Sequence, residues 1–326
     1  MPGDLHPLVF EPVYKDYIWS GARLAKRYSR AVPNGRCAES WEVADRHEGM
    51  SVVKSGPLAG ARLDELVTRF GRSLVGNPWN GGPFPLLVKI IDAGEKLSVQ
   101  VHPDDANAER TGGEPKTEMW YALDAARDAA LYLGFSAGVT RESFAAALAD
   151  NSVEPLLMKH RVSAGDAFYV PGGAVHAIGA GCLLLEVQQN SNTTYRVYDW
   201  GRVDAKTGRP RELHVENALK VIRWTAPAPQ PIRHRTSECG SAPHRMLESP
   251  YFVLDRYDIS KPLALNRNSA SFDILFAADG AVRVTAGSGY ADLQAGTSCL
   301  VPAALPDCRI EPAGQATLLR IAMPAR

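Results

Sequence analysis

The chain has 326 residues, of which 45% are hydrophobic and 22% are charged, and its formal net charge is zero with a pI near 7.1. This length allows about two domains of roughly 150 residues each, and the composition is ordinary for a soluble globular protein. Without a basic surplus, nucleic acid and anionic membranes are not expected as partners, so any bound anion must meet a local cationic site.

The sequence predicts neither a secretory leader nor a membrane-spanning segment. The first residues contain no basic region followed by an apolar run, and no apolar stretch approaches the ~18 residues that a membrane span needs. The cysteines have no metal-binding or CxxC spacing and are expected to be reduced thiols, which favours the cytoplasm. They are Cys37, Cys182, Cys239, Cys299 and Cys308.

Short strand-like runs bounded by Gly, Pro, Asp or Asn dominate the chain, as in a β-barrel or sandwich. The predicted strands are Leu86–Ile91, Lys96–His102, Glu118–Leu123, Ala167–Val170, Cys182–Gln188, Phe252–Ile259, Ser271–Phe276, Ala281–Thr285 and Thr317–Ala322. Helices are predicted at Leu63–Phe70, Arg141–Ala149 and Glu212–Arg223. Thr140 and Ser143 give the second helix a start signal without a full capping box.

A domain boundary is predicted within Thr225–Ile232, where alternating prolines favour an extended, semi-rigid linker. All residues that suggest chemistry precede it, and a β-rich segment of barrel length follows it. We therefore expect a metal-containing catalytic domain over residues 1–228 and a second β domain without a metal over residues 229–326.

The segment from Gly94 to Asp105 carries the strongest chemical signal. Its apolar residues Leu97, Val99 and Val101 alternate with Ser98, Gln100 and His102, so a strand would place the two sets on opposite faces. A row of polar side chains inside a small barrel needs partners, because unpaired buried polar groups are costly.

Two further segments supply metal-ligand types. Glu118 lies on a predicted strand, facing opposite to Met119 and Tyr121, and a Pro-Gly-Gly turn leads to His176. Two imidazoles, one carboxylate and one amide oxygen form a reasonable zinc site with an open position, although iron or manganese would also accept them. The other histidines have no comparable context and are expected to be structural or exposed: His6, His47, His160, His214, His234 and His244.

Two of these segments resemble the cupin motifs. Gly94 followed after five residues by Gln-x-His resembles the first motif, with glutamine in place of its first histidine, and Gly165 followed by Pro171-x-Gly-x-x-His176 resembles the second. Glu118 stands further from His102 than in general cupins, and Ala180 replaces the usual asparagine of the second motif. The general cupin pattern is therefore matched only in part.

Longer motifs resemble the type I mannose-6-phosphate isomerases in their short bacterial form, over about Val9 to Val221. They are Glu39-Ser-Trp-Glu-Val, Ser51-Val-Val-Lys-Ser-Gly-Pro-Leu, Gln100-Val-His-Pro-Asp-Asp, Lys116-Thr-Glu-Met-Trp-Tyr and Gln189-Asn-Ser-Asn-Thr-Thr-Tyr-Arg-Val-Tyr-Asp-Trp. The resemblance implies a mainly β fold of two cupin-like, jelly-roll barrels. It also implies one Zn²⁺ per chain, held by Gln100, His102, Glu118 and His176, and Arg196 as the catalytic arginine.

The implied reaction interconverts mannose 6-phosphate and fructose 6-phosphate through an enediolate, which a divalent cation stabilises. Glu186, on the alternating strand face of Cys182, Leu184, Gln188 and Asn190, is the leading candidate for the base that removes the carbon proton, because the resemblance implies a glutamate close to the metal at this position. Lys116 is the rival, and His102 could assist ring opening. Glu186 could instead orient a ligand histidine. For the phosphate we expect Arg196, Lys116 and Ser98, and whether Arg196 serves the phosphate, the reacting carbons or both stays open.

The C-terminal segment suggests a degenerate second barrel. Gly296 and Pro302 repeat the spacing of the second motif, but Asp307 stands where His176 stands in the first. The segment around Ser271–Val284 contains no Gln-x-His or His-x-His. We therefore expect a barrel that has lost its metal.

Two other functions match part of the pattern. An iron oxygenase of the cupin type would use two histidines and a carboxylate, but the amide ligand Gln100 and the Lys116/Arg196 pair favour a phosphosugar. A non-catalytic sugar-binding cupin should have lost a ligand or Arg196, and neither is lost. We expect a phosphosugar as the small-molecule partner, no nucleic acid or membrane, and a monomer or weak homodimer.

Overall fold

The computed structural model describes residues 4–204, 207–233, 242–265, 267, 270–305 and 307–324. The chain forms two compact units: unit 1 contains residues 1–13, 41–89 and 234–326, and unit 2 contains residues 14–40 and 90–233. Three of the four boundaries along the sequence fall within strands β2 (Val13–Lys15), β3 (Glu39–Val43) and β7 (Leu86–Ala93), and the fourth follows Arg233. The division into domains 1–228 and 229–326 stays a prediction. In the structure, residues 1–13 and 41–89 belong to the same unit as the C-terminal region, and no motif in the sequence indicates this.

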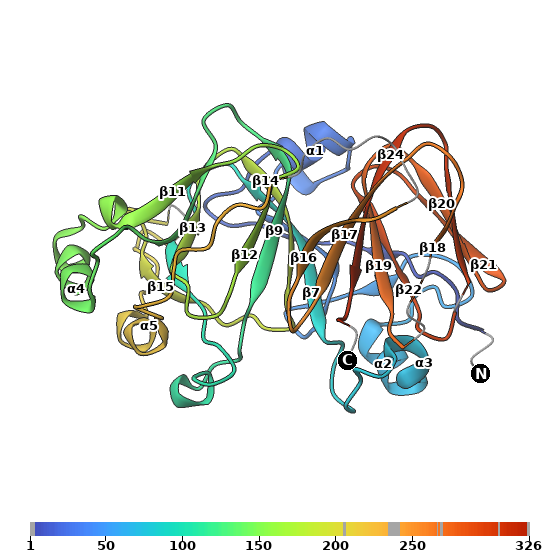
Figure 1. Cartoon of the computed structure of the whole chain (residues 1–326), viewed down its shortest axis with the longest axis horizontal. Coiled ribbons are helices and arrows are strands. Elements are labelled where there is room, and N and C mark those ends of the chain that lie inside the picture. The colour runs from blue at the N-terminus through green and yellow to red at the C-terminus, as the bar shows by residue number, and fades with distance from the viewer. Residues whose placement is uncertain are drawn as a thin grey trace. The chain divides into compact units, whose positions relative to one another are not determined.

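Unit 2 is built mainly from antiparallel strands (Figure 1). One sheet has the order β11-β10-β13-β8-β15, and strands β12-β9-β14 belong to a second sheet. The bounds are β8 (Val99–Val101), β9 (Glu118–Ala125), β10 (Ala130–Phe135), β11 (Leu157–Arg161), β12 (Ala167–Val170), β13 (His176–Ile178), β14 (Cys182–Gln189) and β15 (Tyr195–Tyr198). The helices are α1 (Arg23–Tyr28), α4 (Arg141–Asp150) and α5 (Val215–Val221), with 3-10 turns η2 (Pro33–Gly35), η3 (Glu109–Thr111) and η4 (Glu154–Leu156).

Two apolar clusters hold unit 2 together. The inner cluster joins side chains of both sheets, such as Trp120 and Leu184 with Leu131 and Ile178. The outer cluster packs the other face of the first sheet against helices α4 and α5, through residues such as Phe144. Because apolar residues cover both faces of the five-stranded sheet, a polar group between the two sheets is withdrawn from water and needs a partner.

Unit 1 contains two antiparallel sheets of its C-terminal region, with the orders β16-β17-β24-β19-β22 and β18-β23-β20-β21. Their bounds are β16 (His244–Glu248), β17 (Val253–Ile259), β18 (Leu263–Leu265), β19 (Asp273–Asp279), β20 (Val282–Ala286), β21 (Gly289–Leu293), β22 (Thr297–Val301), β23 (Cys308–Pro312) and β24 (Ala316–Ala322). The unit also holds β1 (Phe10–Glu11), β4 (Asp45–Arg46), β5 (Gly49–Met50), β6 (Val52–Val53), α2 (Leu63–Phe70) and α3 (Arg72–Val75).

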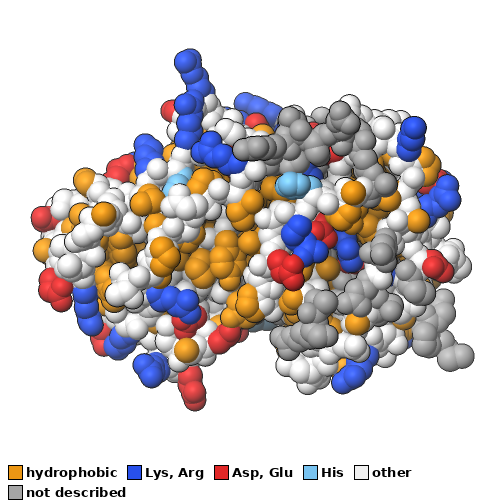
Figure 2. Space-filling view, in the orientation of Figure 1, with side chains coloured by type: hydrophobic (Ala, Val, Ile, Leu, Met, Phe, Trp, Pro, Cys, Tyr) orange, Lys and Arg blue, Asp and Glu red, His pale blue; other side chains and the backbone are white. Residues whose placement is uncertain are grey.

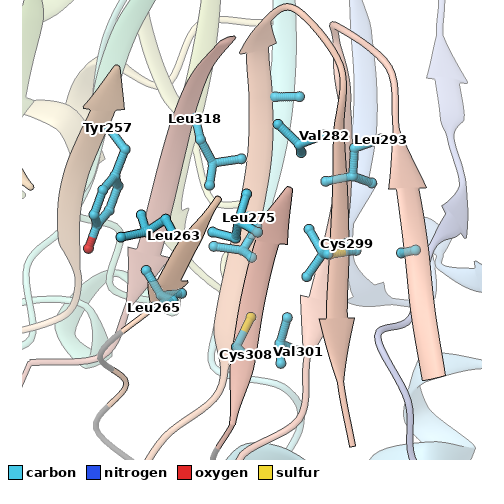
Figure 3. Packing of buried hydrophobic residues seen from close by; sticks show 14 of the residues in the cluster. Tyr257, Leu263, Leu265, Leu275, Val282, Leu293, Cys299, Val301, Cys308 and Leu318 are labelled. Carbon is cyan, nitrogen blue, oxygen red and sulfur yellow. The ribbon is translucent and has the colours of Figure 1, made fainter. Parts of the chain in front are cut away.

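The core of these C-terminal sheets is closely packed and apolar. Alternate residues such as Leu275, Val282 and Leu318 project between the sheets, together with the thiols of Cys299 and Cys308 (Figure 3). At its edge lies a buried ionic group, in which Asp273 accepts hydrogen bonds from Arg267 and Arg320. Since removing one member would leave a buried charge without its partner, this group matters for stability.

The mainly β fold is confirmed, and every predicted strand has a counterpart with ends shifted by at most a few residues. Helix α2 matches its predicted range, whereas α5 is shorter than predicted. The predicted alternation fails at Leu97, which packs in the inner cluster, because β8 begins only at Val99. The expected absence of a full capping box at Thr140 is also wrong, because Ser143 completes the reciprocal pair.

Charges are interspersed on the surface. Figure 2 shows lysine, arginine and acidic side chains scattered over the face in view, with no large region of one sign among the coloured atoms. Within the described residues, no helix is both long and apolar enough to cross a membrane. Recognition of an anion therefore depends on a local group of cations.

Candidate metal centre

Three ionisable side chains of unit 2 converge between its two sheets. Glu118 begins β9, His176 begins β13, and His102 follows β8 directly. Their candidate ligand atoms all lie within 4.8 Å of one another, and the three side chains are buried. Gln100 joins them because it is the register partner of His176 across β8 and β13. The structure thus brings together all four predicted ligands.

Both histidines present the same nitrogen to the centre. His102 Nδ1 lies 2.8 Å from the carbonyl oxygen of Thr193, and His176 Nδ1 lies 2.9 Å from that of Ala174. A carbonyl oxygen can only accept, so each Nδ1 carries the proton and each Nε2 keeps its lone pair. Backbone carbonyls often fix metal-binding histidines in this way. The tautomers therefore suit metal binding.

The Glu118 carboxylate lies between these two nitrogens. Its Oε2 is 3.4 Å from His102 Nε2, and its Oε1 is 3.3 Å from His176 Nε2. Lys116 Nζ lies 2.9 Å from Oε2. Burial alone would raise the pKa of Glu118, but Lys116, His102 and His176 together hold that pKa well below its usual range. The carboxylate is therefore charged at neutral pH.

The imidazoles are held neutral. Burial, assisted by the Lys116 charge, lowers the pKa of His102 to about 3, and burial also lowers the pKa of His176. Neutral imidazoles and an ionised carboxylate are the forms that bind a cation. The protonation states therefore match the ligand set.

Several buried atoms of the cluster lack hydrogen bonds. His102 Nε2 and both oxygens of Glu118 accept none from the described residues, although Lys116 is close enough to Oε2 for an ion pair. A buried acceptor without a donor is costly, and such atoms commonly mark a site for an ion or water. The residues present therefore fit a divalent cation such as zinc.

Gln100 connects this cluster to the predicted arginine. Its Nε2 is 3.1 Å from His176 Nε2, and its Oε1 is 3.5 Å from Ser98 Oγ. Since the two ends of an amide are assigned rather than seen, rotation about its last bond would point Oε1 at the cluster. Ser98 Oγ in turn accepts a hydrogen bond of 3.2 Å from Arg196 Nε. Hydrogen bonds thus link Arg196 to the ligand cluster through Ser98 and Gln100.

Glu186 also lies in the interior of unit 2. Its Oε1 accepts a hydrogen bond of 3.0 Å from Trp120 Nε1, and the Trp120 ring meets the His176 ring edge-on with centroids 5.4 Å apart. The two residues are register partners on β14 and β9, which places Glu186 on the same sheet face as Glu118. The sequence did not single out Trp120, although it stands in the same motif as Glu118.

The turn before His176 depends on a close backbone approach. A Cβ atom at Gly172 would lie 2.7 Å from Asp104 Cα, and the Gly173 amide donates to the His102 carbonyl oxygen. Only glycine allows this contact, since such a distance lies inside van der Waals contact. The turn therefore fixes His176 relative to the segment that carries His102.

No second cluster of this kind occurs among the residues that the structure describes. Asp307 of unit 1 is exposed. His234 and Cys239 lie outside the described residues, and the other four cysteines are buried and form no disulfide with one another. Arg202 makes structural contacts with Asp199 and the Lys96 carbonyl oxygen. Arg211, which the sequence analysis missed because an Arg-Pro-Arg run carries no specific signal, shares Asp199 with Arg202.

Comparison with known proteins places these features in a family. Residues 8–130 match the family model "Phosphomannose isomerase type I, catalytic domain", and residues 244–323 match "Mannose-6-phosphate isomerase, cupin domain". Mannose-6-phosphate isomerase ManA of Bacillus subtilis is 38% identical over 308 residues, which cover 94% of this chain and 96% of that protein. Mannose-6-phosphate isomerase of Streptococcus mutans is 37% identical, covering 91% and 92%. A crystal structure of the Bacillus subtilis mannose 6-phosphate isomerase matches with a TM-score of 0.83 at 31% identity, covering 97% and 99%.

Proposed function

This chain belongs to the type I phosphomannose isomerase family, and from that premise we propose how its buried cluster interconverts mannose 6-phosphate and fructose 6-phosphate. The reaction moves a proton between C1 and C2 and a second proton between their oxygens. The barrier lies in making a carbon-bound proton acidic, since the resulting enediolate carries a full negative charge.

We propose that Gln100, His102, Glu118 and His176 hold one Zn²⁺ per chain. The support is chemical, because two neutral imidazoles, one ionised carboxylate and one amide oxygen suit this ion. A bound divalent cation supplies positive charge beside the substrate's oxygens, and a contact of this kind contributes several kcal/mol to the transition state, where ~1.4 kcal/mol is tenfold in rate.

Two residues are candidates for moving the carbon proton. Glu186 is buried and aligned by Trp120 Nε1, which fits either a base or a group that positions the ring next to His176. Lys116 is buried beside Glu118 and carries protons that it can give or take. We propose Glu186 as the base and Lys116 as the group that shuttles a proton to the substrate's oxygens. His102 is not proposed for ring opening, because its Nδ1 donates to the Thr193 carbonyl oxygen and its Nε2 faces the metal centre.

Arg196 completes the proposed site. It is linked to the ligand cluster through Ser98 and Gln100. We propose that Arg196, Ser98 and Lys116 surround the phosphosugar, with Arg196 donating to its anionic groups.

The observation that carries this proposal is the convergence of buried His102, Glu118 and His176 with unpaired acceptor atoms. The test is a coupled assay for fructose 6-phosphate formed from mannose 6-phosphate. Native protein should be active, chelator-treated protein inactive, and zinc should restore the rate. Metal content, measured on the same samples by mass spectrometry, should follow the activity.

Substitution of the proposed ligands tests the metal site by a second route, alongside chelation. Glu118→Gln and His176→Ala should each lose both bound metal and turnover, since each leaves the remaining ligands too few for tight binding. Full activity in either variant would contradict the ligand assignment. Binding of mannose 6-phosphate without turnover, measured by titration of the native protein, would indicate a sugar-binding cupin, and oxygen consumption with iron would indicate an oxygenase.

The remaining expectations stand as proposals. We propose a cytoplasmic enzyme that is a monomer or weak homodimer and acts without nucleic acid. A sugar phosphate as substrate agrees with the family, and its anionic group needs cationic side chains such as Arg196.

A further inference from the structure

One buried polar side chain beside the ligand cluster, that of Gln188, takes no part in the proposed reaction. Gln188 lies on β14 and is fully buried. It is the register partner of Glu118 across β14 and β9, and directly opposed residues of two strands project from the same face of a sheet. Gln188 therefore lies next to a proposed metal ligand without being one itself.

The Gln188 amide has a single possible orientation. Its Nε2 donates two hydrogen bonds, one of 2.9 Å to the Gln189 carbonyl oxygen and one of 2.5 Å to the Ser191 carbonyl oxygen. Turning the amide around would place Oε1 against both of these oxygens, and a carbonyl oxygen can only accept. Chemistry therefore assigns the nitrogen to the two carbonyls and leaves Oε1 on the other side.

This arrangement has a cost that packing alone would avoid. Gln188 Oε1 is buried and accepts no hydrogen bond from the described residues. A methionine has almost the same length and would fill the space without a buried acceptor that lacks a donor. What a glutamine adds at this position is its pair of N–H donors, so its role should be sought in the backbone that they hold.

That backbone leads to a metal ligand. Residues 190–194 connect β14 to β15, and we call them the β14–β15 loop. Within this loop, Ser191 Oγ accepts a hydrogen bond of 3.2 Å from the Thr193 amide. The Thr193 carbonyl oxygen is the acceptor for His102 Nδ1, at 2.8 Å. A chain of hydrogen bonds thus runs from Gln188 through Ser191 and Thr193 to His102.

The β14–β15 loop is supported from two sides that differ in exposure. On the inner side are the bonds from Gln188, and the one to Ser191 is buried. On the outer side, Thr193 Oγ1 accepts a hydrogen bond of 2.9 Å from the Glu114 amide, and this bond is exposed. Water can replace an exposed hydrogen bond but not a buried one, so the inner support should decide where the Thr193 carbonyl lies.

We propose that Gln188 is a positioning residue, which fixes the Thr193 carbonyl and thereby holds His102 in the tautomer that binds the cation. The proposal rests on the assignment of His102 as a ligand in the proposed function. His102 Nε2 lies 3.4 Å from Glu118 Oε2, so the carboxylate competes with the Thr193 carbonyl for the single ring proton. A ring that carries this proton on Nε2 has no lone pair there for a metal.

The first test compares zinc binding in Gln188→Met and Thr193→Val. Gln188→Met removes both inner donors at nearly constant length, whereas Thr193→Val removes the exposed acceptor and keeps the carbonyl that His102 uses. In competition with a chelator, Gln188→Met should bind zinc about tenfold more weakly or worse, because partners that orient a ligand contribute about 10–100-fold to metal affinity. Thr193→Val should stay within about twofold of the native protein.

The second test reads the tautomer itself, by nitrogen-15 NMR of the imidazole rings in the metal-free protein. Native His102 should carry its proton on Nδ1, and Gln188→Met should move part of the population to Nε2. His176 is an internal control, because its Nδ1 bonds to the Ala174 carbonyl oxygen outside the β14–β15 loop. A general loosening of the structure would alter both rings, whereas the loss of positioning should alter only His102.

Equal losses of zinc affinity in the two variants, or an unchanged His102 tautomer in Gln188→Met, would overturn the proposal. If Gln188→Met does not fold, Ser191→Ala breaks the same chain at its next link and should produce the same change in the His102 ring alone. The ligand assignment is judged separately. If the native protein binds no zinc, that assignment fails, and the NMR comparison by itself decides whether Gln188 controls the His102 ring.

Discussion

At the scale of single residues, the chemistry of this chain depends on atoms that the fold leaves without partners. In His102 and His176, Nδ1 donates a hydrogen bond to a backbone carbonyl oxygen, and Nε2 faces the ligand cluster with its lone pair. Glu118 remains ionised in a dry environment because the Lys116 ammonium lies beside it and lowers its pKa. Buried groups arranged in this way are stable only with a cation or a positive side chain beside them.

Arg196 should be separable from metal binding. In Arg196→Ala the ligand set is intact, so bound zinc should be retained, while kcat/KM should fall by about 100-fold or more because a charge-assisted contact to the substrate is lost. Steady-state kinetics and metal analysis of the same preparation check this. Loss of zinc in this variant would show instead that Arg196 supports the ligand cluster.

The buried thiols should resist alkylation. Burial raises the pKa of Cys182 to about 12 and that of Cys308 to about 11, and it also raises the pKa of Cys299. The thiolate is the reactive form, so at pH 9 these residues should remain unmodified by iodoacetamide in the folded protein, whereas an ordinary thiol with a pKa near 8.5 would react.

Peptide mapping by mass spectrometry reads this out. The control is the same treatment in denaturant, where all three thiols should be alkylated. Rapid modification of Cys182 in the folded protein would contradict its placement in the inner apolar cluster.

Much of the candidate site could be predicted from sequence because its residues stand in local motifs. The alternation around Gln100 and the glycine-rich turn before His176 both indicate which side chains face inward. The position of Arg211 could not be predicted, since it depends on Asp199, which lies 12 residues away and accepts two hydrogen bonds from it. Trp120 was also missed, because a tryptophan in a strand usually indicates packing alone.

At the scale of elements, local signals located the strands and helices well, whereas their contacts needed the tertiary structure. The alternation that is valid for Val99 and Val101 does not extend to Leu97, which lies before β8 and packs on the other side. The start of α4 was predicted from Thr140, but the reciprocal bond to Ser143 depends on a side-chain rotamer. Such details follow from packing rather than from propensity.

The cap of α4 provides a test at this scale. Thr140 Oγ1 accepts a hydrogen bond of 3.2 Å from the Ser143 amide, so Thr140→Ala should lower the free energy of unfolding by about 1 kcal/mol. Urea denaturation measures the difference. Thr140→Ser keeps the acceptor and should be close to the native protein, and an equal loss in both variants would assign the effect to the lost methyl group.

At the scale of the whole molecule, the two units differ in the functional groups they contain. Unit 2 contains the ligand cluster, Arg196 and Glu186, whereas the described part of unit 1 has an apolar core and ion pairs without a metal cluster. The interleaving of segments 41–89 with the C-terminal region was not predictable, because hydrophobic periodicity reports local structure and carries no information on which distant strands will pair.

The buried ions of unit 1 should matter for stability and not for metal binding. Asp273→Asn leaves Arg267 and Arg320 without their shared carboxylate, so the free energy of unfolding should fall by about 3–5 kcal/mol, with zinc still at one per chain. Chemical denaturation and metal analysis check the two parts.

Asp292→Asn is the matched control, since it removes a carboxylate from an exposed pair with Arg283 on β20 and β21. It should leave stability nearly unchanged because solvent screens such pairs. If both substitutions lowered the free energy of unfolding equally, the burial of Asp273 would not explain its effect on stability.

The proposed ligands come from strands of two different sheets, and Gln100 and His176 stand 76 positions apart along the chain. In a zinc finger the ligands are close together in the sequence, so the ion can organise a short segment of chain. The proposed ligands here are too far apart in the sequence for that. Zinc can then bind tightly only after the long-range strand pairs have formed. The rate at which tightly bound zinc appears during refolding would therefore report the last stage of folding.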